Sequence, residues 1–171
     1  MRLVIEPVVG RHVIWTQRGF IKGRSMIANL VDIEEAVAVT ICSSDEGGAL
    51  LFDFASAFPS VEQDFMLDLF TAKQWPKWLL NFIKCLYTNN YCIMMLNGAR
   101  YAGFTITQGV RQGCPLSPLL FAVASDLLLR RLNDLIPEAV ARAFADDLAL
   151  VHSHIMNKVQ LLQDIFEEYH K

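Results

Sequence analysis

Two apolar stretches of this chain are each interrupted by acidic residues. Asp53 lies within residues 49–58, and Asp146 and Asp147 lie within residues 143–151. An ionised carboxylate is costly to bury without a partner, and two adjacent carboxylates also repel each other. A divalent cation would relieve both costs, because carboxylate oxygens are the ligands that Mg²⁺ prefers. The pattern therefore predicts a metal site built where strands end.

An acidic pair has a simpler interpretation, because Asp is common in solvated β-turns. The apolar residues on both sides and the similar segment around Asp53 favour the metal site over that alternative. If the strands are neighbours, the carboxylates converge and can hold two ions about 4 Å apart. We expect Asp53 and Asp146 to bridge both ions. Asp147 contributes less directly, because successive strand residues point to opposite faces of a sheet.

The length suits one domain, or slightly less than one large domain, and the composition indicates a soluble chain with a packed core. The chain has 171 residues, 53% of them hydrophobic, and its formal net charge is -3. This charge argues against a dedicated polynucleotide-binding protein, which usually carries a basic face. The N-terminus lacks the apolar run of a signal peptide, and polar residues interrupt the most apolar segment, 116–132. We therefore expect an intracellular protein without a membrane span.

The four cysteines show neither zinc-ligand spacing nor a disulfide framework. We expect them to be reduced and mostly buried. They are Cys42, Cys85, Cys92 and Cys114.

The periodicity of apolar residues predicts a mixture of helices and strands. Residues 1–16 suit a short extended segment, and Ser25 suits the N-cap of a helix that ends near Val39. Ser60 and Gln63 form a capping-box pattern for another helix. A further helix starts at Pro76. The remaining predicted helices are 117–135 and 157–169, and the predicted strand after the polar turn 43–48 is 49–54, continuous in apolar residues and therefore buried.

Two hairpins complete the prediction. Asn97-Gly98 between residues 91–96 and 101–107 is the strongest hairpin signal, because both residues tolerate the left-handed backbone of a tight turn. A second hairpin joins 138–144 to 148–152 and carries the acidic pair at its tip. The fold class is therefore α+β, with an antiparallel sheet backed by helices. His152 and His154 are expected at a strand edge, without a ligand role.

Four sequence blocks, in this order, resemble the reverse transcriptases of non-LTR (LINE-like) retroelements. The blocks are Gln17 to Ser25, with the pattern Gln-x-Gly-Phe-x-x-Gly-Arg-Ser; Phe52 to Phe58; Gln112 to Phe121, which begins Gln-Gly-Cys-Pro; and Phe144 to Asp147. Group II intron enzymes are a more distant likeness. The resemblance implies a right-hand polymerase palm that adds deoxynucleotides to a primer 3′-hydroxyl, using Mg²⁺ or, as a substitute, Mn²⁺. RNA template, DNA primer and dNTP are the implied partners.

The resemblance also implies roles for single residues. Asp53, Asp146 and Asp147 would be catalytic and bind metal, and Phe54 would belong to the metal site. Further implied contacts with the incoming nucleotide or template come from Ala57, Phe58, Gln112 and Gly113. Phe58 would collide with a 2′-hydroxyl, so that the product is DNA. An ordinary place in the core is the alternative for Phe58, and a turn that leads into a core helix is the alternative for the Gln112 block.

Basic and aromatic side chains offer weaker candidates. Arg18, Lys22 and Arg24 suit contacts with phosphates, although a solvated basic loop fits them as well. Trp75, Trp78 and Tyr91 lie at spacings that favour core packing over base stacking.

The match is partial at both ends. We expect residues 1–48 to be the end of the fingers region and 49–171 the palm core, with no thumb. The lysine that would protonate pyrophosphate in this family, and the primer-gripping hairpin, would follow the acidic pair and are not found in residues 148–171. We therefore expect weak or no activity from the isolated chain.

Two alternatives stay open. One is a non-catalytic retroelement-derived relic that binds nucleic acid or a protein partner. The other is an RNA-dependent RNA polymerase, against which Phe58 argues. The sequence leaves template preference, host element and oligomeric state undetermined.

Overall fold

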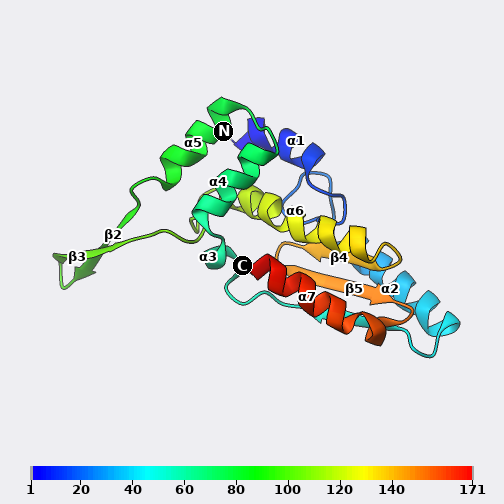
Figure 1. Cartoon of the computed structure of the whole chain (residues 1–171). Helices are drawn as coiled ribbons and strands as arrows, with labels where there is room; N and C mark the ends of the chain where they lie inside the picture. Colours follow the sequence, from blue (N-terminus) through cyan, green and yellow to red (C-terminus); the bar gives the residue numbers. More distant parts are fainter. Residues whose placement is uncertain (1, 171) are drawn as a thin grey trace. The chain divides into compact units, whose positions relative to one another are not determined.

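The computed structural model describes residues 2–170, which form two compact units. Unit 1 combines Met1–Ala55 with Pro115–Lys171, and unit 2 is Ser56–Cys114. Each unit has its own helices and its own sheet (Figure 1).

Unit 1 is built on a three-stranded antiparallel sheet. Its strands are β1 (Gly48–Phe52), β4 (Val140–Phe144) and β5 (Asp147–His152), in the order β1-β5-β4. β4 and β5 form the predicted second hairpin, and β1 pairs with β5 over its whole length. The neighbouring strands needed to bring the acidic segments together are therefore confirmed.

Helices cover both faces of this sheet. On one face, α6 (Ser117–Leu135), the 3₁₀ turn η1 (Ile155–Lys158) and α7 (Val159–His170) enclose a core that includes Leu148 and Leu150. The face that carries Arg142 and Phe144 is covered by α2 (Met26–Ser43), which contacts all three strands. The predicted α+β class, an antiparallel sheet backed by helices, is confirmed.

The prediction for the first sixteen residues is wrong. Residues 2–12 form the helix α1 (Arg2–His12), with Pro7 inside it. Ile5 and Val9 are buried, and Val13 continues their spacing of four residues. This helical period outweighs Pro7, whose missing N–H removes one hydrogen bond of the helix.

β1 and α2 depart from their predicted details. β1 lies at the edge of the sheet and alternates in exposure, so that Leu51 is 79% exposed; the expectation of a fully buried strand is wrong. α2 starts after Ser25 as predicted but continues to Ser43 instead of ending near Val39, because no Gly or Pro interrupts it. The predicted helices 117–135 and 157–169 correspond to α6 and to η1 with α7.

Unit 2 contains three helices and one hairpin among its described residues. The helices are α3 (Ala57–Ser60), α4 (Gln63–Ala72) and α5 (Lys77–Tyr87). Phe70 and Trp75 pack edge to face, with ring centroids 4.7 Å apart, and Leu79 and Ile83 of α5 are also buried. α5 begins directly after Pro76, its N-cap, so the predicted helix start at Pro76 is confirmed.

The hairpin joins β2 (Tyr91–Leu96) to β3 (Ala99–Thr105) through Asn97-Gly98. Both turn residues have a positive φ, 50° and 78°, as the sequence predicts. Most side chains on both strands are exposed. Tyr91 (53% exposed) and Trp78 (50% exposed) are therefore not core residues, whereas the prediction for Trp75 (4% exposed) is confirmed.

Two smaller predictions are wrong. Ser60 ends α3 and bonds the Ala57 carbonyl, while Glu62 is the N-cap of α4, so the capping box does not form. All four cysteines are free, but two are exposed and two half-buried, because they lie at element ends and on the open hairpin. Among residues 2–170, no helix is long and apolar enough to cross a membrane.

Candidate active site

The predicted carboxylates lie at the same end of two adjacent strands, β1 and β5. Asp53 directly follows β1, and Asp147 begins β5. The register pairs Phe52 with Leu148, so its next step places Asp53 opposite Asp147. Asp146 lies in the two-residue turn before β5. Residues almost a hundred positions apart are thus brought to the same edge of unit 1.

The acids are more exposed than their apolar neighbours suggest. Asp53 and Asp147 are exposed and Asp146 is half-buried, because strand ends project beyond the region that the helices cover. The expectation that a cation is needed to offset the cost of burying these carboxylates is therefore wrong. Within the described chain, no group of three or more His, Cys, Asp or Glu residues is placed to hold a metal ion. The donor chemistry still fits: a few accessible carboxylates suit Mg²⁺, which keeps several water or substrate oxygens as ligands.

Aromatic packing anchors the segment that carries Asp53. The rings of Phe52 and Phe54 lie 4.8 and 6.0 Å from the ring of Phe166 on α7, measured between centroids. Because side chains alternate along an extended chain, Asp53 is directed away from this cluster. Phe54 thus has a packing role beside the implied metal-site role. His152 is buried in β5 and accepts a hydrogen bond from the backbone N–H of His154, and neither belongs to a metal-binding group.

The turn that carries Asp146 is held by a buried side chain from the N-terminal part of unit 1. The Gln17 amide bonds both the N–H and the C=O of Ala145, at 3.0 Å each. The backbone of Gln17 also forms a parallel bridge with Ala143. The sequence prediction placed Gln17 in a basic loop and missed this contact. Its position at the head of the Gln-x-Gly-Phe block is the only signal for it in the sequence.

Two of the three basic candidates have partners within unit 1. Arg18 donates to the Asp32 carboxylate at 2.7 Å, and Arg142 of β4 donates to the same oxygen at 2.6 Å. The Arg142 guanidinium also lies over the ring of Trp15, 4.2 Å from its centroid. The hydrogen bond from Arg142 and, less strongly, that from Arg18 lower the pKa of Asp32 below its ordinary value.

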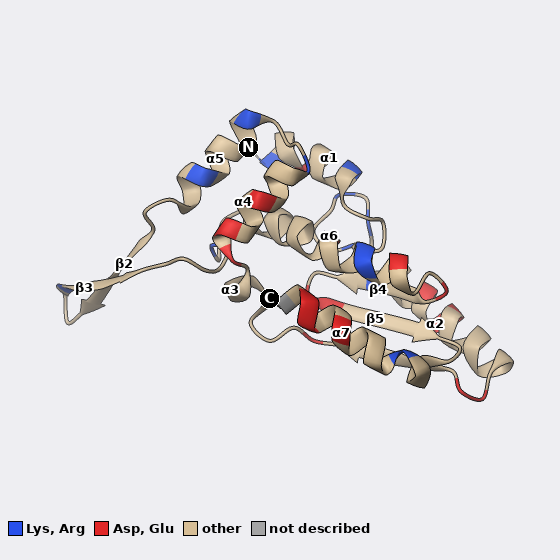
Figure 2. Cartoon of the chain, viewed as in Figure 1, with Lys and Arg blue, Asp and Glu red and all other residues tan. Residues whose placement is uncertain are grey.

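Arg24 is also engaged within the fold. Its guanidinium donates to four backbone carbonyls at 2.6–2.9 Å, those of Gly10, Val13, Ile14 and Gln17. Burial lowers the pKa of this group from its ordinary value, although the charge is kept. Lys22, in contrast, is exposed. Among residues 2–170, the basic residues are spread over many elements and form no continuous stripe on any one of them (Figure 2).

The residues implied to contact the nucleotide lie in unit 2. Ala57 is buried and Phe58 half-buried in α3, which begins after Ser56 with a φ of 55°. The Val110 N–H donates to the Phe58 carbonyl at 3.0 Å, so α3 is fastened to the loop that leads to Gln112. The structure therefore brings Phe58 and the Gln112 loop together within this unit.

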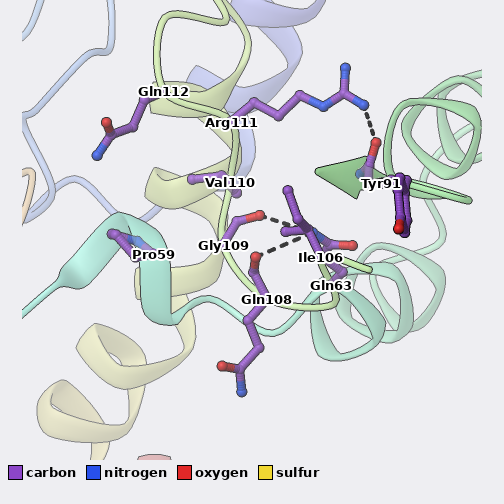
Figure 3. A pocket seen from close by; sticks show the side chains of 10 residues that line it. Pro59, Gln63, Tyr91, Ile106, Gln108, Gly109, Val110, Arg111 and Gln112 are labelled. Carbon is purple, nitrogen blue, oxygen red and sulfur yellow. Dashed lines mark hydrogen bonds between the residues drawn. The ribbon is translucent and has the colours of Figure 1, made fainter. Parts of the chain in front are cut away.

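A pocket of about 400 Å³ opens beside this loop (Figure 3). Gln63 lines the pocket and donates to the carbonyls of Gln108 and Gly109, at 3.4 and 3.1 Å. Arg111 and Gln112 extend from opposite sides of the loop, and Arg111 bonds the side chain of Asn90. Gln112 and Gly113 are both exposed, and Gly113 has a φ of 79°, which favours glycine.

Comparison with known families gives one match that covers almost the whole chain. The family described as "Reverse transcriptase (RNA-dependent DNA polymerase)" matches residues 2–171.

Relatives come from several retroelements. The "Transposon TX1 uncharacterized 149 kDa protein" of Xenopus laevis is 26% identical over 96% of this chain, which spans 13% of that protein. A "Retrovirus-related Pol polyprotein from type-1 retrotransposable element R2" of Popillia japonica is 30% identical over 73% of the chain and 22% of its own length. The protein of the same description from Nasonia vitripennis is 36% identical over 59% of the chain and 10% of its own length.

Proposed function

This chain belongs to the reverse transcriptase family, in its non-LTR retrotransposon branch, and on that premise we propose that it carries the catalytic palm of an RNA-directed DNA polymerase. The observation that carries the proposal is the placement of Asp53 and of the Asp146-Asp147 pair at the same end of the neighbouring strands β1 and β5. The chain spans between about a tenth and a fifth of its relatives' lengths, so template, primer and dNTP as its partners are part of the proposal.

Asp53, Asp146 and Asp147 would hold the divalent cations, Mg²⁺ or Mn²⁺. Bound there, the cations would polarise the primer hydroxyl and stabilise the leaving pyrophosphate. The chain's own contribution is to fix the three carboxylates on strand ends backed by helices. Phe52 and Phe54 support the Asp53 segment through Phe166, and we include Phe54 in the metal site as the resemblance implies.

We assign nucleotide selection to unit 2. The Phe58 ring would exclude a 2′-hydroxyl, and Ala57, which is buried, would leave room for the sugar. Gln112 and Gly113 would approach the nucleotide and the template from the exposed loop. The hydrogen bond between Val110 and Phe58 supports a joint role for these residues, because it ties the two segments together.

Among the basic candidates, Lys22 is the one we assign to phosphate contacts. It is exposed, whereas the guanidinium groups of Arg18 and Arg24 already bond a carboxylate and backbone carbonyls. The regional division into fingers (1–48) and palm (49–171) remains part of this proposal.

Primer extension by the purified chain tests the proposed function. The assay uses an RNA template, a DNA primer and dNTPs, with Mg²⁺ or Mn²⁺. We expect weak or no DNA synthesis from the isolated chain, and Asp146→Asn should reduce any synthesis by about 10³-fold or more, since the carboxylate that holds the cations is lost. Asp134→Asn is the matched control, because Asp134 is an exposed acid on α6 of the same unit and has no assigned role.

Two further arms separate the alternatives. Phe58→Ala should increase ribonucleotide incorporation. If the natural chain and Phe58→Ala discriminate equally between deoxynucleotides and ribonucleotides, the assigned role of Phe58 is contradicted.

Mn²⁺ binding in the presence of dNTP, followed by electron paramagnetic resonance, distinguishes an enzyme from a relic. A chain that binds Mn²⁺ no better than Asp146→Asn and extends no primer is a non-catalytic relic.

A further inference from the structure

One buried side chain forms hydrogen bonds with both backbone polar groups of Ala145, the residue before Asp146. Gln17 is completely buried, and its amide uses its whole hydrogen-bonding capacity. The Oε1 atom accepts from the N–H groups of Gly19 and Ala145, at 2.8 and 3.0 Å. The Nε2 group donates to the carbonyl of Ala145 at 3.0 Å and to Ser125 Oγ at 3.2 Å. Both polar groups of Ala145 are therefore fixed by one residue.

The backbone conformation of Ala145 explains why these hydrogen bonds are needed. Ala145 has a φ of 59°, in the left-handed region that a residue with a Cβ rarely adopts. Such a conformation persists only where the surroundings hold it. Nothing in the local sequence Phe-Ala-Asp-Asp offers the usual left-handed residues, Gly or Asn, at this position.

The backbone of Gly19 packs directly against the backbone of Ala145. A Cβ atom on Gly19 would lie 2.2 Å from the nitrogen of Ala145 and 2.9 Å from its Cα. Only glycine can therefore occupy position 19 while Ala145 stays where it is. Two independent features of the segment 17–19 thus converge on a single residue of the acidic turn.

Several hydrogen bonds attach the segment around Gln17 to the rest of unit 1. The backbone of the segment pairs with β4, through Arg18 N–H to the Ala143 carbonyl at 2.8 Å and Ala143 N–H to the Thr16 carbonyl at 2.9 Å. Asn29 of α2 donates to the same Ala143 carbonyl. Arg24 holds the carbonyl of Gln17 itself, at 2.6 Å. Gln17 is thereby attached to the sheet, to α2 and to its own loop before it reaches the turn.

We propose that Gln17 is a positioning residue that sets the direction of the Asp146 carboxylate through the peptide of Ala145. The inference rests on the proposed function, because it assigns Asp146 to a divalent cation. It adds a residue that touches neither cation nor substrate. A residue that orients a metal ligand in this way commonly changes metal affinity by about 10- to 100-fold when it is removed.

Mn²⁺ binding by the whole chain tests the proposal, with Mn²⁺ alone as the probe. We expect Gln17→Leu to weaken binding by about tenfold relative to the natural chain. Gly19→Ala should do the same through a different chemical change, since the added Cβ displaces Ala145. Ile136→Val is the stability control: it trims a buried core residue at the end of α6 and should lower the melting temperature without changing Mn²⁺ affinity.

Amide hydrogen exchange supplies the second measurement, and it needs no metal. Gln17→Leu should speed exchange at Ala145 at least tenfold more than at Leu150 in the middle of β5. Gln17→Glu should recover protection at Ala145 as the pH falls from about 8 to about 5, because a protonated carboxyl group can both donate and accept like the amide. Gln17→Leu has no such group and should not recover.

The outcomes separate this inference from the proposed function. If the natural chain binds Mn²⁺ no better than Asp146→Asn, the metal part of the proposed function fails, and exchange at Ala145 decides by itself whether Gln17 holds the turn. If Asp146→Asn loses binding but Gln17→Leu keeps it, the positioning role is overturned while the metal site stands. Uniform acceleration of exchange across β5 also overturns it, because Gln17 would then support only the fold.

Discussion

The two hairpins of this molecule have turns of the same length that are stabilised in different ways. Both are antiparallel and both turn in two residues, Asn97-Gly98 between β2 and β3 and Ala145-Asp146 between β4 and β5. The first turn is held by its own residues, and a Cβ placed on Gly98 would meet nothing within 4 Å. The second has no turn-forming glycine and is held by Gln17 and Gly19. Because tertiary contacts hold the second turn in a conformation that its own residues do not favour, these contacts also decide the direction of the acidic side chain that the turn carries.

The largest expected difference between the hairpins is in amide hydrogen exchange. β4 and β5 lie within a covered sheet, whereas β2 and β3 form a two-stranded sheet with mostly exposed side chains. Isolated two-stranded sheets are marginal in water. We expect amides such as Leu150 to exchange about 10³-fold more slowly than amides such as Met94, as measured by NMR or mass spectrometry. Equal protection in both hairpins would remove the basis of the comparison.

Arg24→Met should cause the largest loss of stability among single substitutions in the frame of the acidic hairpin. It removes charge-assisted hydrogen bonds to four carbonyls around the α1–α2 connection. We expect the free energy of unfolding in urea to fall by about 3 kcal/mol. Lys22→Met, an exposed change two residues away, should stay within about 0.5 kcal/mol. If the two substitutions cost the same, Arg24 does not hold this segment.

Substituting one turn residue should lower the free energy of unfolding in the β2–β3 hairpin but not in the β4–β5 hairpin. Asn97→Ala places a Cβ-bearing residue without local hydrogen-bonding ability at a φ of 50°, and we expect a loss of about 1 kcal/mol. Ala145→Gly relieves a strained φ of 59° that Gln17 continues to hold, so stability should be unchanged or rise by up to about 1 kcal/mol. Chemical unfolding measures both. A loss of stability in Ala145→Gly would mean that Gln17 alone does not hold the turn.

The same contrast explains what could be predicted from the sequence. Local sequence predicts the β2–β3 turn and the starts of α2 after Ser25, of α5 at Pro76 and of α6 at Ser117, and these predictions are confirmed. The helix α1 was missed, although Ile5, Val9 and Val13 carry a helical period, because Pro7 suggested an extended segment. In that case a tertiary core outweighed a local signal.

The candidate site shows the same division between local and long-range information. Hydrophobic patterning predicts a strand before Asp53 and a hairpin around the acidic pair but leaves open whether these strands are neighbours, and the structure shows that β1 and β5 are. The exposure of Asp53 could not be predicted, because it depends on how far the helices cover the strand ends. The role of Gln17 could not be predicted either, because its partner Ala145 lies 128 positions along the chain. Neither propensity nor periodicity contains such a contact.

The smallest expected effect concerns pH, and it is confined to the acidic hairpin. Asp32 joins Arg18 to Arg142 of β4, whereas Arg100 is the only charged residue in β2 and β3. Because its arginine partners lower the pKa of Asp32 in the folded state, the stabilisation is present above the ordinary Asp pKa of about 3.9 and is lost as pH falls through the lowered value. Asp32→Asn should therefore cost about 1 kcal/mol near pH 7, and the difference from the natural chain should shrink toward about pH 3 in urea unfolding. Asp134→Asn, at an exposed position of α6, is the control for the loss of one negative charge. A cost of Asp32→Asn that stays constant down to acid pH would show that the arginine pair does not act through the charge of Asp32.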